Sequence, residues 1–475
     1  MQFKVLSHAG MLVTSANGKK LVCDPWLVGS SYWRSWWNYP PVSREAITDL
    51  QPDVIYLTHI HWDHFHGPSL ELFDKNTRIV VPKGNYSRNK DDLRTLGFKN
   101  VVELKHGEKY EIDTDFSISS YQFGVFLDSA VLIDCDGKKL LNLNDSKHMG
   151  GTLRQIVSNH KPIDFVFRSH SSANSRMSYE LLDKPGEIED DIDRYVQDFA
   201  NTAKAVGARY AIPFASNHCH LHKDSWKYNP LVQTPVMVQD YFEKHQINTP
   251  RLVVMVSGDS YEARNDSFDL NPADWFTNRE QHLEQYLTDN SERLNQFYEE
   301  EENTKINKKV VEKYFGNLAT KLPFFFKNRL KDAVFTYILG NGDRVGYVFN
   351  INVATGEVVE INNQTELNFQ DFPIQIRTTT FIFKRCIAFR IFSHMSIGKR
   401  VFYKLHSKDK GKMELLNLIF NLDEYDMLPL NRLFTPRSLE TWRLRWREIG
   451  LYLSLLKDKI IYRKLDFSKY LKPIQ

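Results

Sequence analysis

The chain has 475 residues, 42% of them hydrophobic and 25% charged, which is typical of a globular protein with two or three domains. No segment approaches about eighteen uninterrupted apolar residues, which excludes a transmembrane helix, and four cysteines without a CxxC pair exclude a disulfide framework. The N-terminus has no basic segment followed by a long apolar one, so we expect no signal peptide and a cytoplasmic protein. The net charge of +3 conceals an asymmetry: residues 376–475 hold 21 Lys and Arg against 9 Asp and Glu, whereas residues 1–375 hold 41 against 50.

The first forty residues predict a set of short strands followed by an aromatic loop. Residues 3–6, 11–14 and 20–23 alternate as strands around a turn. His8 and Asp24 fall at strand ends, where we expect them to support neighbouring ligands and not to bind metal themselves. Residues 26–41 contain four tryptophans, so this irregular segment packs either in a core or subunit contact or at the lip of a substrate cleft.

Residues 53–67, DVIYLTHIHWDHFHG, contain the densest group of metal-ligand residues. Residues 54–57 predict a short buried strand, after which come His59, His61, Asp63 and His64. Residues two apart on an extended chain point the same way, so His59 and His61 can face one ion while Asp63 and His64 turn toward a neighbouring position. These ligands suit zinc, and also iron or manganese. A histidine-rich surface loop is the weaker alternative, because the pattern begins where a hydrophobic strand ends.

Three later strands also end in candidate site residues. Residues 140–144 lead to Asp145, a carboxylate that can bridge two ions or, taken alone, cap a turn. Residues 165–168 lead to His170, and residues 210–214 lead to a second histidine cluster: His218, His220 and His222. Between these strands, residues 187–206 predict an amphipathic helix that ends at Gly207.

The last part of the chain has a different pattern. Residues 276–298 predict a helix, and the acidic run 299–302 marks a boundary. Beyond it, residues 333–339, 345–351 and 358–361 predict strands, and residues 439–462 predict an amphipathic helix suited to a core or to a membrane interface. We expect a catalytic domain over residues 1–270, a helical extension over 271–330 and a basic α+β domain over 331–475.

The pattern at residues 59–64 matches the HxHxDH signature of the metallo-β-lactamase superfamily. Within it, the chain resembles the metallo-β-lactamase-like part of CMP-N-acetylneuraminate hydroxylases in residues 24–29, Trp36 and Trp37, residues 132–145 and residues 211–215. A wider resemblance takes in lactonases and phospholipase D-like enzymes. The likeness covers about residues 8–260. It implies an α/β fold, an αββα sandwich of two facing sheets with helices outside and the metal site at one edge.

The resemblance also implies roles for individual residues. It makes metal ligands of His59, His61, Asp63 and His64, a shared ligand of Asp145, and a second-site ligand of His222, with His218 and His220 as rivals. Asp63 would also act in catalysis by orienting a water molecule, and His170 would reach a substrate pocket lined by residues 171–177.

Two features differ from the family pattern. Residues 122–128 lack the histidine that usually precedes the strand leading to Asp145, so the first site would either borrow His218, His220, His170 or Asp128 or hold no metal. The chain also lacks the Cys and His pairs of a Rieske centre.

We therefore expect a metal-dependent hydrolase that uses one or two zinc ions, or iron or manganese, to activate water against a small anionic substrate carrying phosphate or sugar. Arg34, Arg168 and Arg176 are candidates for holding its phosphate. One alternative is an iron-dependent oxygenase of a nucleotide sugar with an external electron donor, and another is a non-catalytic binding protein. We expect no nucleic-acid partner; peripheral membrane contact through the basic domain and homo-oligomer formation are open alternatives.

Overall fold

The computed structural model describes residues 1–171, 178–185, 193–341, 344–361, 372–462, 467–472 and 474. Two sheets form the first part of the chain. The eight-stranded sheet has the order β19 (Ser267–Asp269), β18 (Ser260–Glu262), β1 (Gln2–Val5), β2 (Met11–Thr14), β3 (Lys20–Cys23), β6 (Val54–Tyr56), β7 (Arg78–Pro82), β8 (Val101–Leu104). The seven-stranded sheet has the order β17 (Arg251–Leu252), β15 (Tyr210–Pro213), β13 (Phe165–Arg168), β12 (Lys138–Asn144), β11 (Asp128–Cys135), β10 (Phe116–Phe123), β9 (Lys109–Asp113).

The two sheets face each other across a shared apolar core. Side chains such as Phe3 and Val13 from the first sheet meet Ile133, Phe165 and Ile212 from the second. The alternation that predicted these strands produces this core, because every second side chain of β2 is buried between the sheets.

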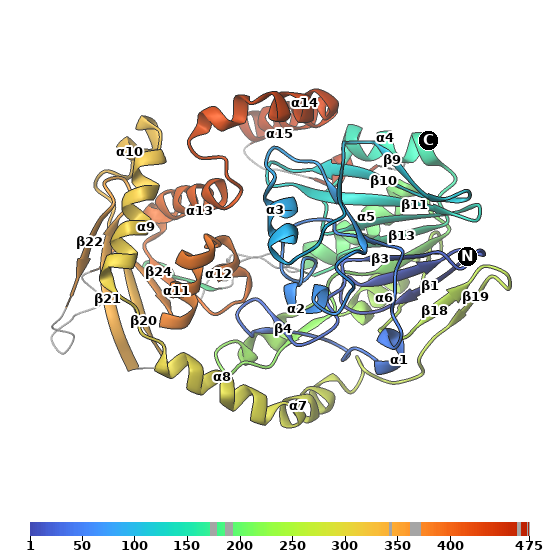
Figure 1. Cartoon of the computed structure of the whole chain (residues 1–475), viewed down its shortest axis with the longest axis horizontal. Coiled ribbons are helices and arrows are strands. Elements are labelled where there is room, and N and C mark those ends of the chain that lie inside the picture. The colour runs from blue at the N-terminus through green and yellow to red at the C-terminus, as the bar shows by residue number, and fades with distance from the viewer. Residues whose placement is uncertain are drawn as a thin grey trace.

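Helices cover the outer face of each sheet. The first sheet is covered by α2 (Gly67–Leu70) and α3 (Arg88–Thr95), and the second by α4 (Gly150–His160), α5 (Asp193–Val206) and α6 (Pro235–Lys244). The short α1 (Arg44–Ile47) follows the aromatic segment. The predicted αββα sandwich is confirmed (Figure 1).

A third sheet forms the C-terminal unit. Its order is β14 (Tyr179–Leu181), β24 (Phe402–Leu405), β23 (Ile374–Thr378), β20 (Phe335–Asn341), β21 (Arg344–Asn352), β22 (Glu357–Glu360). Its helices are α9 (Lys308–Lys321), α10 (Phe324–Leu330), α11 (Thr380–Phe389), α12 (Ser393–Ile397) and α13 (Lys410–Glu424). The predicted α+β architecture of this part is confirmed, and α7 (Arg279–Asp289) and α8 (Ser291–Asn303) connect it to the sandwich (Figure 1).

Two segments pack on a different unit from the one that their position in the sequence predicts. Strand β14 lies within the first 270 residues but pairs in parallel with β24 of the third sheet. Conversely, α14 (Pro436–Leu444) and α15 (Trp446–Tyr462) return to the sandwich, where Leu451 joins the core beneath α4. Gly150 permits this contact, because a Cβ there would lie 3.4 Å from Leu451 and 3.3 Å from Tyr470. The boundaries at residues 270 and 330 stay predictions.

Several predicted elements differ in the structure. The helix expected over residues 276–298 is two helices separated at Asn290, and the helix expected over 439–462 is separated at Arg445, whose guanidinium is buried against Glu448. The aromatic segment is not wholly irregular, because β4 (Ser30–Ser31) and β5 (Trp36–Asn38) form a small sheet with β16 (His218–His220). Residues 187–192 of another expected helix lie outside the described residues.

All four cysteines are buried and unpaired. Among the described residues, no helix has the length and apolar character needed to cross a bilayer.

Candidate metal centre

The HxHxDH residues lie in a tight turn directly after β6. The amides of His64 and Phe65 both donate to the carbonyl of His61, at 3.0 and 2.7 Å, which folds the segment back on itself. This turn buries His59, Asp63 and His64 at the edge of the first sheet. Because the turn is local, one short segment supplies several ligand-type side chains to the same place.

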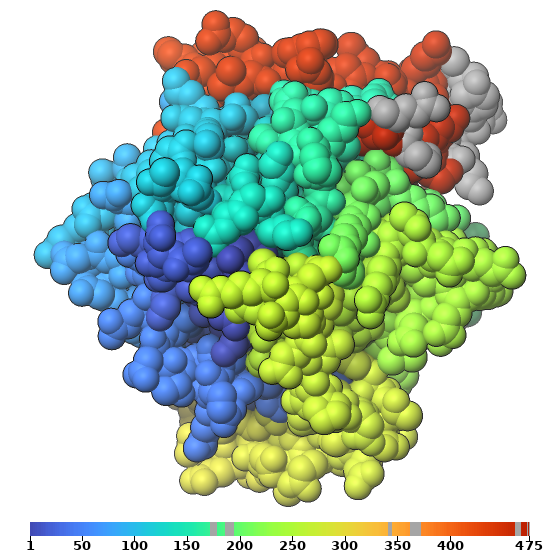
Figure 2. Space-filling view, turned by 90° about the vertical axis from the view of Figure 1, so that its right-hand side faces the viewer, coloured from blue at the N-terminus to red at the C-terminus, as the bar shows by residue number. Residues whose placement is uncertain are grey.

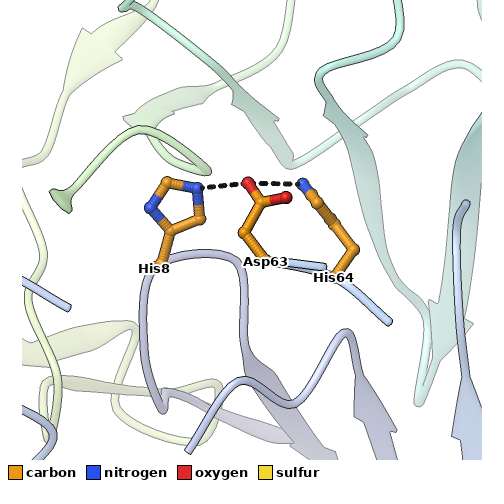
Figure 3. A group of neighbouring side chains, drawn as sticks. All are labelled: His8, Asp63 and His64. Atoms are coloured by element: carbon orange, nitrogen blue, oxygen red, sulfur yellow. Dashed lines mark ion pairs between the residues drawn. The ribbon is translucent and has the colours of Figure 1, made fainter. Parts of the chain in front are cut away.

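Within the described part of the chain, three overlapping groups of side chains have the composition of a metal site. They are His59, His61 and Asp128; His59, His64 and Asp145; and His8, Asp63 and His64, with the ligand atoms of each group within 4.8 Å of one another. Figure 3 shows Asp63 between His8 and His64, with its Oδ2 3.0 Å from His8 Nε2 and 3.5 Å from His64 Nε2. His59 belongs to two of the groups and His64 to two, so the three groups form one continuous cluster.

The environment of His64 fits a cation at this position. Its Nδ1 lies 2.7 Å from Asp24 Oδ2, and Asp24 in turn accepts hydrogen bonds from the amide and hydroxyl of Thr58. The Nε2 atom makes no hydrogen bond to the described residues, although Asp145 Oδ2 lies 3.3 Å away. An imidazole held by a carboxylate on one nitrogen and facing carboxylates with the other is the usual arrangement of a metal-binding histidine.

Electrostatics support the same conclusion. Burial lowers the pKa of His64, but Asp63 and Asp24 outweigh burial and raise that pKa well above its usual value. Burial and the nearby Asp145 raise the pKa of the Asp128 carboxyl to about 7. Negative charge is thus concentrated around His64 and Asp128, which is the environment that a divalent cation requires.

The two histidine clusters meet at one cavity. It has a volume of about 300 Å³, and both the first cluster and the second contribute to its wall. The lining residues that matter here are His61, Asp63, Asp128, Asp145, Lys147 and His218. His218 stacks on Trp36 with ring centroids 3.7 Å apart and lies 5.8 Å from the ring of His8.

The other histidines of the second cluster have different surroundings. His220 Nδ1 lies 3.0 Å from the Ser35 hydroxyl. His222 lies 3.7 Å from Glu301 Oε2 and is not part of the three groups. The Arg400 guanidinium occupies the space between Glu301 and Asp224, so the carboxylates beside His222 already have a cation. The structure therefore brings His218 to the cavity, and not His222, which the family resemblance had favoured.

His170 is fully buried behind this cavity. Its amide donates to the Ser216 hydroxyl at 2.9 Å, and neither ring nitrogen has a hydrogen-bond partner among the described residues. Burial, reinforced by His8, lowers the pKa of His170 to about 3. Ser171 of the expected pocket loop over residues 171–177 lines the cavity, and residues 172–177 lie outside the described residues, so the role of His170 stays a prediction.

The two predicted phosphate-binding arginines that the structure describes are engaged elsewhere. Arg34 pairs with Glu300, and Arg168 donates to the carbonyl of Ser146 inside the protein; Arg176 lies outside the described residues. The exposed Lys147 lies on the cavity wall instead. It follows Asp145 by two residues, but nothing in its local sequence marked it as a binding residue.

His8 lies closer to the candidate ligands than its sequence position indicated. It belongs to one of the three groups, and its Nε2 lies 3.0 Å from Asp63 Oδ2, but that it supports other ligands and does not bind metal itself stays a prediction. A lone histidine at the end of a strand gives no local signal. The turn after β1 places His8 beside Asp63, because the backbone of His8 is fixed on both sides. The His8 amide donates a hydrogen bond to the Asn38 side chain, and the His8 carbonyl accepts one from the amide of Ala215.

Replacing Asp24 by asparagine tests the support of His64. We expect metal affinity to fall about 10- to 100-fold, because the amide no longer fixes the imidazole as strongly or raises its basicity. Competition with a chromogenic chelator measures this affinity. Asp53→Asn is the matched control, since Asp53 forms a surface contact with Lys19. Equal affinities of the two variants would contradict the assignment.

Comparison with known proteins shows what parts of this chain are similar to. Residues 2–126 match the family described as beta-lactamase superfamily domain. A Mycolicibacterium smegmatis protein named for a Rieske 2Fe-2S centre is 27% identical over 240 residues, covering 46% of this chain and 44% of that protein. The mouse cytidine monophosphate-N-acetylneuraminic acid hydroxylase is 28% identical over 166 residues, covering 33% of this chain and 29% of the hydroxylase. The chain thus spans less than half the length of these curated relatives.

Several solved structures also align with part of this chain. An isothiocyanate hydrolase from Delia radicum gut bacteria is 17% identical with a TM-score of 0.41, covering 55% of this chain and 99% of the other. CmlA, a diiron beta-hydroxylase from Streptomyces venezuelae, is 17% identical with a TM-score of 0.35, covering 53% of this chain and 52% of the other. The family match and the hydroxylase relatives confirm the resemblance predicted from the sequence.

Proposed function

We propose that this chain, whose first part is a metallo-β-lactamase-fold domain, is a metal-dependent hydrolase of a small anionic substrate. One observation carries the proposal: imidazoles and carboxylates from separate strand ends converge on a single cavity that also has Lys147 on its wall. Two adjacent metal positions, the first with His59, His61 and Asp128 and the second with Asp63, His64 and His218, would share Asp145. When bound, the ions would lower the pKa of a water molecule and polarise the bond under attack.

The chain's own residues would orient the reaction. Asp63 accepts a hydrogen bond from the hydroxyl of Tyr32 and lies beside His8, so its carboxylate is fixed from two sides. Tyr32 and Trp36 form the aromatic part of the wall, and Ile397 of α12 closes it from the C-terminal unit. Lys147 would bind the anionic group of the substrate, which places the reacting bond toward Asp145.

Replacing Lys147 by alanine tests the anionic substrate. With a panel of phosphodiesters, lactones and neutral esters, we expect KM to rise about tenfold for the anionic compounds only, because one charged hydrogen bond is lost. Lys204→Ala on α5 is the control, since Lys204 is an exposed lysine that does not line the cavity. Equal changes for charged and neutral compounds, or no hydrolysis of the panel by the metal-loaded protein, would count against the proposal.

Asp128 favours a second candidate, an iron-dependent oxygenase. Two histidines and one carboxylate form the ligand set of many non-haem iron oxygenases, and His59, His61 and Asp128 have this composition. Two of the relatives named above are a hydroxylase and a Rieske-named protein. Because the Cys and His pairs of a Rieske centre are absent from this sequence, such an enzyme would take electrons from a separate donor protein. Iron in protein purified without added metal, with oxygen consumption that depends on a reductant, would favour this candidate over the hydrolase.

A further inference from the structure

The exposed side of α15 has an apolar stripe that the fold does not use. Trp446, Ile449, Leu453, Leu456 and Ile460 are spaced by three, four, three and four residues and are 42% to 70% exposed. The opposite side of the helix already packs on the sandwich through Leu451. One apolar face suffices to hold a surface helix, so the second face has no role in the fold.

The segment before α15 carries further exposed apolar side chains. Leu439 of α14 and Phe434 at the end of η6 (Leu430–Phe434) are also largely exposed. The two helices form one edge of the molecule, with their outer surface open to solvent (Figure 2). We call Phe434, Leu439 and the five α15 residues the α14–α15 stripe.

The charges beside the stripe have one sign. Arg443, Arg447, Lys457 and Lys459 are exposed, and none forms an ion pair with the described residues. The three acidic residues of these helices are all neutralised: Glu440 by Lys83 and Lys105, Glu448 by Arg445, and Asp458 by Lys469. The net charge that the described part of this surface presents is therefore positive.

A groove beside the stripe adds to this arrangement. It has a volume of about 510 Å³, lies between α4 and α15, and includes Arg154, Trp446 and Arg447 on its wall. The Arg447 guanidinium lies 4.6 Å above the ring of Trp446, so the cation and the aromatic ring face the same place. Guanidinium groups bind phosphate strongly, and tryptophan favours the interface between water and lipid.

We propose that the α14–α15 surface docks on a membrane containing anionic phospholipids. The stripe would enter the region between headgroups and acyl chains, and the four cations would lie at the level of the phosphates. Charge complementarity selects this partner over a second copy of the chain, because an identical surface would bring like charges together across a two-fold contact. The proposal does not depend on the activity of the metal centre.

Vesicle sedimentation with the full chain tests the proposal. We expect binding to vesicles of phosphatidylcholine mixed with phosphatidylglycerol, little binding to phosphatidylcholine alone, and weaker binding as salt increases. Leu453→Asp combined with Leu456→Asp should reduce binding at least tenfold, and Arg447→Glu combined with Lys457→Glu should do the same. Phe324→Asp is the control, since Phe324 of α10 is an apolar side chain that is 82% exposed and outside the stripe.

Two outcomes would overturn the proposal. One is equal binding to both kinds of vesicle, or none to either. The other is a dimer in solution that Leu453→Asp with Leu456→Asp converts to a monomer, without any vesicle binding by the unmodified chain. Circular dichroism shows that the variants are folded, which we expect because all four substituted side chains are exposed. If the aspartate variant unfolds, the charge-reversal variant alone decides.

Discussion

Replacing His61 and Asp63 together by alanine is expected to remove the bound metal and to reduce turnover at least about 10³-fold. The two residues belong to different ligand groups, His61 with His59 and Asp128, and Asp63 with His8 and His64. The double variant therefore takes one ligand from each of the two adjacent positions. Metal content after dialysis is the measurement, because it requires no knowledge of the substrate.

A histidine away from the cavity provides the control for this variant. His245→Ala removes an exposed imidazole after α6, and we expect its metal content to equal that of the unmodified protein. Asp63 also accepts a hydrogen bond from the Tyr32 hydroxyl, so the double variant loses a structural contact as well as metal ligands. Thermal unfolding of all samples in the presence of chelator separates the two effects. Undiminished metal content in the folded double variant would refute the assignment of the centre.

Replacing Arg400 by alanine is expected to lower the free energy of unfolding by about 3–5 kcal/mol. Arg400 is fully buried and joins three separate segments: it donates to Glu301 at 2.5 Å, to Asp224 at 3.0 Å and to the carbonyl of Trp33 at 2.6 Å. Its removal leaves Glu301, which is 3% exposed, as a buried carboxylate without its main partner. Urea unfolding measures the loss.

Arg385→Ala is the matched control. Arg385 pairs with Glu300 on the surface, where both side chains are more than 40% exposed, so we expect a change below about 1 kcal/mol. Similar losses in the two variants would show that Arg400 does not hold the units together.

The pH dependence of stability provides a second readout for Arg400. Burial by itself would raise the pKa of Glu301, but Arg400 and then His222 hold it well below its usual value. A lowered pKa in the folded state adds stability above the unfolded-state pKa, and this contribution is lost as the pH falls below it. We expect the Arg400→Ala variant to lose less stability on acidification than the unmodified chain does.

Local sequence was sufficient for the cluster at residues 59–64. These residues are nearly contiguous, and one turn after β6 determines where they point, so no distant contact was needed to predict their convergence. The strands could also be predicted from the sequence, because the period-two alternation of β2 directly reflects one buried and one less buried face. The interruption between α14 and α15 at Arg445 could not be predicted from the sequence, because the apolar periodicity runs through it. Only the buried contact of Arg445 with Glu448 marks the separation of the two helices.

The choice among the later histidines depended on strand pairing. Counting along the sequence favoured His222, whereas the structure pairs β16 with β5, opposing His218 to Asn38 and stacking its ring on Trp36 beside the cavity. His222 lies past the end of β16, where Glu301 and Arg400 surround it. Which of these histidines binds metal stays a prediction.

The sequence by itself determined the ligand types of the candidate metal centre and the part of the chain that carries most of them, because the ligand-type residues at 59–64 are neighbours along the chain. Only the tertiary structure decided that His8, Asp128 and His218 share a cavity with them, and that Arg400 fills the space beside His222. The physical reason is distance along the chain: these groups come from segments more than forty residues apart from the cluster, and only pairing between strands and packing between units brings them together.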